Sequence, residues 1–397
     1  MYRCGKKGAA AVFIVLICTT MIAACTVIGN AAFARLKTAS CDAALTIGCR
    51  SVLSEFDRRL KSDYQIFAYK SSKHEVEEKL ENYIELNLSK CIKPFRAGEV
   101  CVKAENIEFS VTEPEEIEKQ IVEAGKFCAA GVSYVKGRGK PVEPAGTIKN
   151  KAMIGTLPSQ GKNLKIINIE GIDCTKALTD SVTDTFFTDK YILETFGTRL
   201  SAPQGRYGYF NYEVEYILSG KTSEAENLSH VRKLIFAMRE PLNAAHILSD
   251  PAKMLEIEEY IAGLPPGAST VTAAIIVAAW AAGESENDVR LLLDGKNVAL
   301  AKHKRQWALG LENALSIVAG GKDYIEPADK NGQSYEDYLS MLLYTEDRET
   351  KLVRVMDLIQ INLRSNYNGS FLLKELYTGF SMNADVDGRK YSYVHTY

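Results

Sequence analysis

The sequence predicts an α+β protein that is anchored in a membrane by one N-terminal helix. Three observations lead to this prediction. Residues 9–29 form a run without a charged residue, apolar residues at helical spacing follow it, and most of the remaining chain alternates helical patterns with a few short strand-like segments. We therefore expect a transmembrane helix that continues into a stem helix, and then a mainly helical exported domain with small β elements.

Composition excludes several classes of protein. The chain has 397 residues, of which 46% are hydrophobic and 25% charged, so it can bury a core and is not globally disordered. Its net charge of −2 excludes a strongly basic nucleic-acid-binding protein. The charge is uneven, because residues 1–37 carry five bases and no acid. The other 360 residues hold 43 bases and 50 acids, a net charge of −7.

The uncharged run from Ala9 to Gly29 predicts the membrane anchor. As a helix with a rise of 1.5 Å per residue it spans about 31 Å, which matches the hydrocarbon core of a bilayer. Three basic residues precede it, Arg3, Lys6 and Lys7. Because positive charge is retained on the cytoplasmic side, we expect residues 1–8 in the cytoplasm, a single pass through the lipid, and an extracytoplasmic C-terminal domain.

Three alternatives to an uncleaved anchor remain open. A cleaved secretory signal would end near Ala34, although its apolar region normally has about 7–15 residues. A lipoprotein signal would place an acylated cysteine at Cys25, after two small alanines. A prepilin-type signal would be cut after Gly8, so that Ala9 becomes the first residue. Type IV pilins carry a glutamate at the fifth mature position, where this chain has Phe13.

The apolar spacing predicts that this helix continues as a stem over residues 30–70, ending near Ala68. One stripe at intervals of three and four residues contains Leu45, Val52, Leu53, Phe56 and Leu60. Pilins and pseudopilins are built with such a stem, half in lipid and half packed on a globular head. Any anchored protein with a juxtamembrane helix would show the same pattern.

Two segments are expected after the stem. Residues 71–135 predict a small α+β module, in which a capping box at Ser72 opens a helix, residues 99–111 alternate as a strand, and Pro114 opens a second helix. Residues 136–165 contain five glycines, three prolines, seven basic residues and one acid. That composition predicts a solvated linker or loop.

Residues 166–397 predict a mainly helical exported domain that ends in a hairpin. The expected helices cover residues 180–200, 223–248, 270–293, 334–348 and 351–363, with one more that begins at Asp250. The hairpin covers residues 371–393 and turns at Asp387-Gly388. An apolar run at residues 271–282 is too short for a second span and predicts a core helix.

The cysteines supply one candidate disulfide. All nine lie within the first 174 residues. Cys91 and Cys101 flank a turn that contains proline and glycine, so they are the most plausible disulfide pair, with unpaired thiols as the favoured alternative. The sequence has no CxxC motif, and no histidine lies near enough to complete a zinc pattern.

The sequence contains no recognisable catalytic or cofactor-binding motif. It lacks GxSxG and HExxH patterns, and its five histidines are isolated. Residues 383–388 match the first half of a calcium-binding loop, but the twelfth position is Val394 where a glutamate is needed. We therefore expect a non-enzymatic protein with no cofactor, no metal and no small-molecule substrate.

Four carboxylates form a candidate partner-binding surface. Glu213 and Glu215 alternate with apolar residues, and Glu284 and Asp288 lie four residues apart beyond the apolar core helix. We expect the second pair to share one exposed helix face. Packing and capping roles are the favoured interpretation of all four, and contact with a partner protein is the alternative.

Several segments resemble a family of membrane-anchored proteins of unknown function encoded with Tad (tight-adherence, or Flp) pilus genes in Gram-positive bacteria, with a TadE/TadG-like N-terminus. The similarity covers residues 1–70 and 190–395. Its blocks are Lys7-Gly8 with the apolar run, 51–57 and 63–67, and, in the more specific distal part, 212–221, 280–296, 334–339, Arg348 and 356–360. One departure is Asn30, at a position where the family often has an acid.

The resemblance implies a pilus-associated assembly or minor component that acts through contacts with pilus or secretion-machinery proteins. It supplies no catalytic residue. Because Phe13 replaces the pairing glutamate, a role at the pilus base or in initiation fits better than incorporation into the shaft. The alternative is a lipoprotein-like envelope binding protein or enzyme anchored through Cys25.

Overall fold

The computed structural model describes residues 6–90, 100–165, 182–265, 272–321 and 323–397, and it confirms the predicted α+β class. The chain forms two compact units, which are described separately. Unit 1 contains Met1–Asp57, Phe67–Ser110 and Glu375–Tyr397. Unit 2 contains Arg58–Ile66 and Val111–Lys374.

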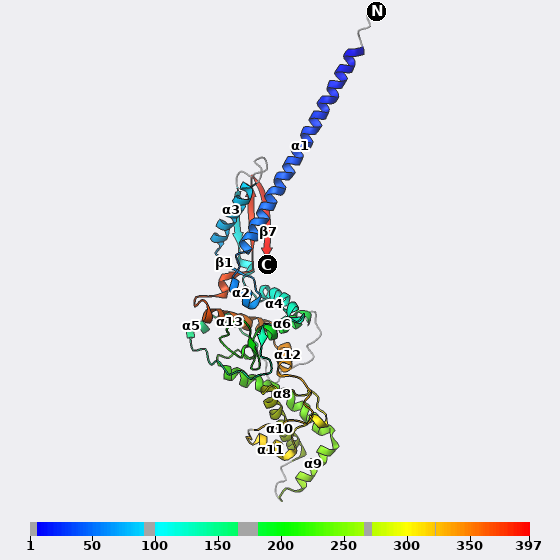
Figure 1. Ribbon diagram of the computed structural model, residues 1–397, viewed down its shortest axis with the longest axis vertical. Coiled ribbons are helices and arrows are strands. Elements are labelled where there is room, and N and C mark those ends of the chain that lie inside the picture. The colour runs from blue at the N-terminus through cyan, green and yellow to red at the C-terminus, as the bar shows by residue number, and fades with distance from the viewer. Residues whose placement is uncertain (1–5, 91–99, 166–181, 266–271, 322) are drawn as a thin grey trace, which may run out of the picture. The chain divides into compact units, whose positions relative to one another are not determined.

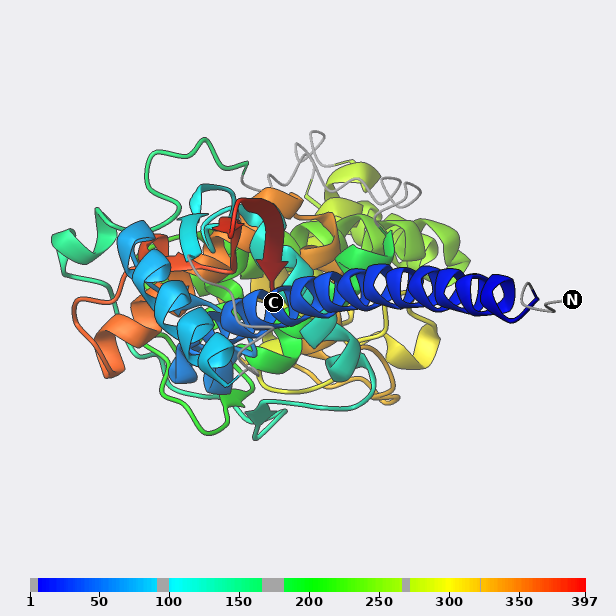
Figure 2. The same ribbon diagram turned by 90° about the horizontal axis from the view of Figure 1, so that it is seen from above.

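Helix α1 of unit 1 begins at Lys6 and ends at Leu53, and both ribbon views show it as one unbroken helix (Figures 1 and 2). Within the described residues it is the one helix that is long and apolar enough to cross a membrane. Its N-terminal half presents apolar side chains outward; Val27 and Ile28, for example, are each 68% exposed. This exposure fits a segment that is solvated by lipid rather than by water.

The C-terminal half of α1 is a core element of unit 1. Cys41, Leu45, Cys49 and Val52 are buried at intervals of three and four residues. They pack against α3 (Lys73–Ser89), which begins at the predicted capping box, where Ser72 and Glu75 each bond the other's backbone N–H. Four residues of α3, one per turn, complete this interface: Val76, Leu80, Ile84 and Leu88.

A three-stranded antiparallel sheet completes the core of unit 1. Its strand order is β2 (Val100–Glu105), β6 (Gly379–Val386) and β7 (Arg389–Thr396), and a short pair, β1 (Tyr69–Lys70) with β5 (Leu376–Tyr377), lies apart from it. Asp387 (φ 53°) and Gly388 (φ 78°) both adopt left-handed backbone between β6 and β7. Such a two-residue turn matches the twist of a hairpin, so the predicted turn is confirmed.

Unit 2 is mostly helical. Its helices are α2 (Arg58–Tyr64), α4 (Pro114–Ala129), α5 (Lys151–Ile154), α6 (Val182–Thr195), α7 (Glu213–Ser219), α8 (Glu224–Ser249), α9 (Pro251–Ala262), α10 (Ala273–Leu293), α11 (Leu311–Val318), α12 (Tyr335–Thr345) and α13 (Arg348–Asn366). Short 3-10 turns occur at Ile107–Phe109 in unit 1, at Lys304–Gln306 in unit 2, and at Leu373–Glu375 where the chain returns to unit 1. One short strand pair joins β3 (Val135–Lys136) to β4 (Ala202–Pro203).

Two helices organise the core of unit 2. Every residue of α13 from Thr350 to Leu363 is buried, so this helix is surrounded by protein on all sides. Helix α10 packs between α8 and α11, and its residues Ile276 and Trp280 are buried (Figure 1). The apolar run at residues 271–282 therefore contributes to a core helix, as predicted, over its described part.

The predicted stem is shorter than expected. Helix α1 ends at Leu53, and the chain folds back so that the amide of Asp57 donates to the carbonyl of Ala68 at 2.8 Å. The last apolar residue of the stripe, Leu60, belongs to α2 and is buried in unit 2. Residues of this one stripe are therefore buried in two separate cores. The spacing alone did not predict that division.

The basic segment at residues 136–165 is a mostly exposed loop of unit 2 rather than a linker between domains. The amide of Val142 donates to the carbonyl of Arg199 at 2.7 Å, and the amide of Ile148 donates to that of Thr222 at 2.9 Å. The amide of Ser159 donates to Oδ1 of Asp357 at 2.9 Å. Because its backbone groups are satisfied by unit 2, this segment is an ordered part of that unit.

The two compact units also differ from the division predicted from the sequence. The expected small module at residues 71–135 is divided, since Val111 and the residues after it belong to unit 2. The terminal hairpin belongs to unit 1 rather than to the distal helical domain, because β6 pairs with β2 from Val100↔Val386 to Glu105↔Ser381. The larger segment of unit 2, Val111–Lys374, is thus inserted in the chain between two strands that pair with each other.

Candidate functional site

A groove of about 1160 Å³ lies between α6, α8 and α12 of unit 2. Its apolar wall includes Phe186, Leu193, Met238, Leu242, Leu300 and Met341. Phe186 is 53% exposed and Leu242 40% exposed, so apolar surface is open within it. Grooves with flexible methionines among branched apolar side chains are suited to binding other apolar surfaces.

Two hydrogen-bond acceptors belong to the wall of this groove. Pro241 lies inside α8 and has no N–H, so the carbonyl of Ala237 receives no bond from the residue that would normally donate to it. Oε1 of Glu336, near the start of α12, is buried and has no hydrogen-bond partner within the described chain. An occupant with hydrogen-bond donors would satisfy both acceptors.

Charged residues at another part of the groove are already paired. Glu194 accepts from Arg138 and, at 3.1 Å, from Lys190. Asp189 accepts from Nζ of Lys351 at 2.5 Å, and both side chains are nearly inaccessible to solvent. The pairs with Lys351 and Arg138 fix the middle and the C-terminal end of α6 against the rest of unit 2.

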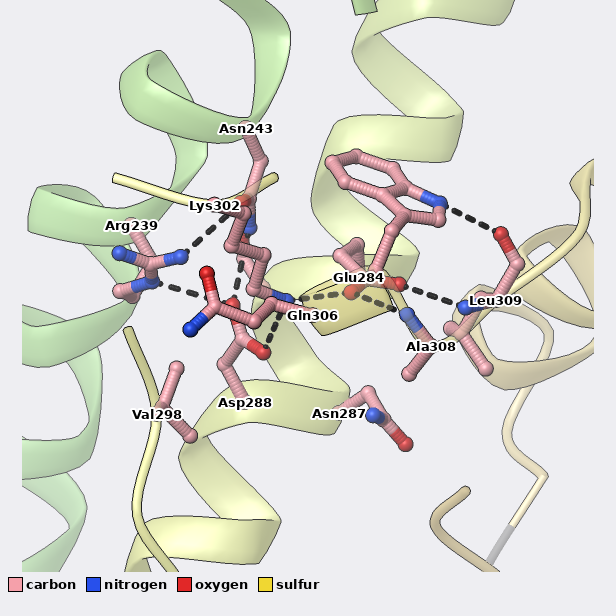
Figure 3. Close-up of polar contacts among 12 residues, drawn as sticks. Arg239, Asn243, Glu284, Asn287, Asp288, Val298, Lys302, Gln306, Ala308 and Leu309 are labelled. Carbon is pink, nitrogen blue, oxygen red and sulfur yellow. Dashed lines mark hydrogen bonds and ion pairs between the residues drawn. The ribbon is translucent and has the colours of Figure 1, made fainter. Parts of the chain in front are cut away.

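A second site of interest is a buried charge network centred on α10 (Figure 3). Nζ of Lys302 contacts Oε1 of Glu284 and lies 2.6 Å from Oδ1 of Asp288. The lysine side chain is 3% exposed, and both carboxylate side chains are 0% exposed. Desolvation by burial is the main influence on Glu284 and raises its pKa, an effect opposed by Lys302.

The two carboxylates of this network have different surroundings. Glu284 accepts the backbone amides of Ala308 at Oε1 (3.0 Å) and of Leu309 at Oε2 (2.9 Å). Oδ2 of Asp288 accepts instead from side chains of α8, namely Nε of Arg239 at 3.0 Å and Nδ2 of Asn243 at 3.1 Å (Figure 3). Backbone donors therefore hold one carboxylate, and a guanidinium and an amide hold the other.

Aromatic rings enclose one side of this network. Nζ of Lys302 lies 5.4 Å from the ring centroid of Trp307, and Nζ of Lys253 lies 3.9 Å from the same ring and 4.4 Å from Trp280. The ring of His246 stacks on Trp307 at 4.8 Å. Burial lowers the pKa of Lys253 to about 8. The aromatic groups limit the access of water to the lysine amines.

Glu213 and Glu215 lie in a third buried cluster. Arg206 forms a bidentate pair with Glu213, and Oε1 of Glu215 accepts the amide of Arg199 at 2.9 Å and the hydroxyl of Tyr335 at 2.8 Å. Burial raises the pKa of Glu215 to about 7. Every residue of α7 is buried, so the alternating pattern marks a helix that is covered on all sides.

These positions correct the expectation of an exposed acidic face. Glu213, Glu215, Glu284 and Asp288 are all 0% exposed, and they hold amides and basic side chains inside unit 2. The favoured packing role agrees with this geometry, and the partner-surface alternative does not. Helical spacing correctly placed Glu284 and Asp288 on one face, but residues distant in sequence cover that face.

The remaining sequence candidates lie in unit 1. Gly8, Ala9 and Cys25 are part of α1, and the Cys25 side chain is exposed. Cys101 lies on β2 and is exposed, whereas Cys91 is outside the described residues, so their disulfide stays a prediction. Among the side chains that the structure describes, no group of three histidine, cysteine or acidic residues could hold a metal ion.

Sequence reasoning missed the groove and the basic members of the charge network. Arg239, Asn243 and Lys302 carry no motif, and they reach Asp288 from positions 14 to 49 residues away. One signal was available for the groove: Pro241 lies inside a predicted helix, beside Met238 and Leu242. A proline inside a helix removes one backbone hydrogen bond and leaves a carbonyl on the preceding turn without its usual donor.

Comparison with known proteins places the chain in a family without assigning an activity. No curated protein and no solved structure matches it significantly. One family model matches residues 141–388, which cover most of unit 2 and the central strand of the unit 1 sheet. The chain thus belongs to the family of unknown function DUF5702.

Proposed function

We propose that this protein is a membrane-anchored extracytoplasmic component of a pilus or envelope assembly system and that it acts through protein contacts. The observation that carries the proposal is the division of α1 into two halves. Apolar side chains of the first half are exposed, while those of the second half form the core of unit 1 with α3 and the sheet. A helix of this kind connects a membrane anchor directly to a folded domain, because its first half is suited to lipid and its second half belongs to the core.

The charge distribution supports the proposed orientation. Arg3, Lys6 and Lys7 precede the apolar half of α1, so the short N-terminus is assigned to the cytoplasm and the large C-terminal part to the outside. The resemblance to proteins encoded with Tad pilus genes supplies the proposed setting. In that setting the protein stays at the membrane as an assembly or minor component.

The groove between α6, α8 and α12 is the proposed contact site for a partner. Its apolar wall favours an amphipathic helix, and its acceptors, the unpartnered Oε1 of Glu336 and the Ala237 carbonyl that Pro241 cannot bond, favour one that carries a lysine or arginine. We therefore assign the groove to such a helix of a pilus or secretion-machinery protein.

Two leucines of α8 provide a matched pair for testing the partner. Leu242 lines the groove, whereas Leu248 is on the same helix, is 61% exposed and does not line it. In the native host we expect Leu242→Glu to reduce pilus assembly and adhesion toward the level of a deletion strain, and Leu248→Glu to leave both unchanged. Normal pili and normal adhesion in the deletion strain would overturn the proposed function.

Crosslinking would identify the occupant. A photoreactive amino acid at Leu242 should capture a pilus or secretion-machinery protein through a basic amphipathic segment, and the same label at Leu248 should not. Capture at both positions, or of unrelated proteins only, would contradict the assignment of the groove. Labelling with a palmitate analogue that disappears in Cys25→Ala would instead support lipid attachment at Cys25, the alternative form of the anchor.

A further inference from the structure

The Lys302 network places a primary amine directly against a carboxylate in a site that excludes water. Nζ of Lys302 is 2.6 Å from Oδ1 of Asp288, and neither side chain is more than 3% exposed. An amine and a carboxylic acid in such contact have lost most of the translational freedom that slows their condensation in solution.

We propose that Lys302 and Asp288 form an intramolecular amide bond with the loss of one water, and that Glu284 transfers the proton between them. The inference does not depend on the proposed function or on the identity of a partner. It assigns a covalent modification site to a network that would otherwise be a set of buried ion pairs.

The surroundings of Asp288 identify it as the electrophile. Oδ2 accepts from Nε of Arg239 at 3.0 Å and from Nδ2 of Asn243 at 3.1 Å, on the side of the carboxylate away from the lysine contact at Oδ1. When the amine attacks Cγ, negative charge develops on Oδ2. Donors that are already aimed at this oxygen stabilise that charge without reorganisation.

The surroundings of Glu284 suit it to proton transfer. Its Oε1 contacts Nζ of Lys302, while the amides of Ala308 and Leu309 hold the carboxylate in place. The raised pKa of Glu284 brings its proton affinity closer to that of the groups between which it works. Because it touches the reacting nitrogen, Glu284 is a catalytic residue for this step rather than a positioning one.

The step balances as follows. Protonated Lys302 passes one proton to Oδ1 of Asp288, which leaves a neutral amine and a neutral acid. The nitrogen lone pair attacks Cγ, and the carbonyl electron pair moves to Oδ2. Glu284 takes one proton from nitrogen and returns it to the Oδ1 hydroxyl. The Cγ–Oδ1 bond then breaks, water leaves with its electron pair, and the Oδ2 pair restores the carbonyl.

The product fits the site better than the reactants in one respect. The reaction removes one positive and one negative charge from a desolvated region and leaves Arg239 and Glu284 as the charged groups that contacted the reacting pair. No oxidant, reductant or co-reactant is needed. The bond would join α10 covalently to the segment that follows it and crosses α8 at Leu300, where the carbonyl accepts from Nη1 of Arg239.

Peptide mapping of the full chain, purified in detergent and then denatured, tests the proposal. Trypsin should fail to cut after Lys302 and should release residues 254–290 joined to residues 297–304. The joined peptide should be about 18 Da lighter than the sum of its two parts, which is the mass of one water. Recovery of these segments only as separate linear peptides, with normal cleavage after Lys302, would overturn the proposal.

Fragmentation and one variant test the assigned roles. Fragment ions should locate the branch at Asp288, and a branch at Glu284 would contradict the choice of electrophile. Glu284→Gln, with native tryptophan fluorescence as the criterion of folding, should lose at least nine-tenths of the branched peptide. A branched peptide that forms undiminished in this variant would overturn the role of Glu284.

The same molecule contains an internal control. Lys351 and Asp189 form a buried pair at 2.5 Å, but Lys351 makes its other hydrogen bond to the carbonyl of Leu343 rather than to a second carboxylate. We expect trypsin to cut after Lys351 as after an ordinary lysine. A branched peptide at Lys351 would show that contact between an amine and a carboxylate is sufficient for the reaction. It would contradict the proposal that a second carboxylate must transfer the proton.

Discussion

Arg206 and Glu213 form a bidentate ion pair inside unit 2. Nη1 donates to Oε1 at 2.8 Å and Nη2 donates to Oε2 at 2.7 Å, and the two side chains are 3% and 0% exposed. Glu213 also accepts from Nδ2 of Asn362 at 2.6 Å and from the amide of Gly197 at 2.9 Å. The pair thereby connects α7 to α13 and to the end of α6.

The first prediction concerns this pair. Arg206→Met leaves the Glu213 carboxylate uncompensated in the core and should lower the free energy of unfolding by about 3–5 kcal/mol. Urea denaturation followed by tryptophan fluorescence reports on unit 2, because both tryptophans of the chain, Trp280 and Trp307, lie there.

A surface pair is the control for that measurement. Arg232 pairs with Glu286 at 2.8 Å, with side-chain exposures of 41% and 25%. Arg232→Met should cost no more than about 1 kcal/mol, because solvent screens the charges of an exposed pair. Equal losses of unfolding free energy in the two variants would show that the buried Arg206–Glu213 pair contributes no more to stability than the exposed pair.

The second prediction concerns pH. Burial raises the pKa of Glu215 from 4.5 to about 7. The folded state therefore holds the proton more tightly, and this contribution to stability is complete below pH 4.5 and is lost as the pH rises through about 7. Glu215→Gln should remove up to about 3 kcal/mol of the decline in unfolding free energy across this range.

Urea titrations at a series of pH values measure this effect. Glu226 on α8 is exposed, so Glu226→Gln is the matched control and should leave the pH profile unchanged. If Glu215→Gln retains the full decline between about pH 5 and pH 8, another buried acid, such as Asp357 with its pKa raised to about 6, accounts for the profile instead.

The third prediction concerns the packing of α10 on α11. A Cβ on Gly283 would lie 2.5 Å from the carbonyl oxygen of Ala314 and 2.7 Å from its Cα, which is closer than atoms in contact allow. Gly283→Ala should therefore force the helices apart and lower the unfolding free energy by about 1–3 kcal/mol.

Gly155 provides the comparison for Gly283. It ends α5 with a right-handed helical backbone, and the nearest atom to an added Cβ is a carbonyl oxygen at an ordinary 3.5 Å. Gly155→Ala should be nearly neutral in the same denaturation experiment. A neutral Gly283→Ala would mean that α10 and α11 are separated more widely than the structure shows.

The fourth prediction concerns thiol reactivity. Cys49 and Cys128 are buried, and desolvation raises their pKa values to about 12 and about 11. Because the thiolate is the nucleophile, both should resist iodoacetamide in the folded protein and react after denaturation. Peptide mass spectrometry after a short labelling pulse measures each site.

The exposed Cys101 extends this experiment to the predicted disulfide. If Cys101 is bonded to Cys91, it should react only after reduction, and a free Cys101 should react at once. Prompt labelling of Cys101 without a reductant would therefore rule out the expected bond, and labelling of Cys49 at the same rate would contradict its burial.

Local features of this protein were readable from the sequence. The uncharged run predicted the exposed half of α1, the Ser72 capping box predicted α3, and Asp387-Gly388 predicted the turn between β6 and β7. Each of these depends on residues within a few positions of one another. Helix propensity, capping and backbone conformation are decided at that range.

Tertiary structure decided what covers each element. The sequence placed Glu284 and Asp288 on one helix face, but only folding brings Lys302 and Arg239 onto that face and turns an expected surface into a buried network. Likewise, only folding pairs β2 with a strand almost 280 residues later and makes a linker-like segment part of unit 2. The periodicity of a sequence shows which side chains share a face, whereas burial depends on contacts between distant segments, which leave no local pattern.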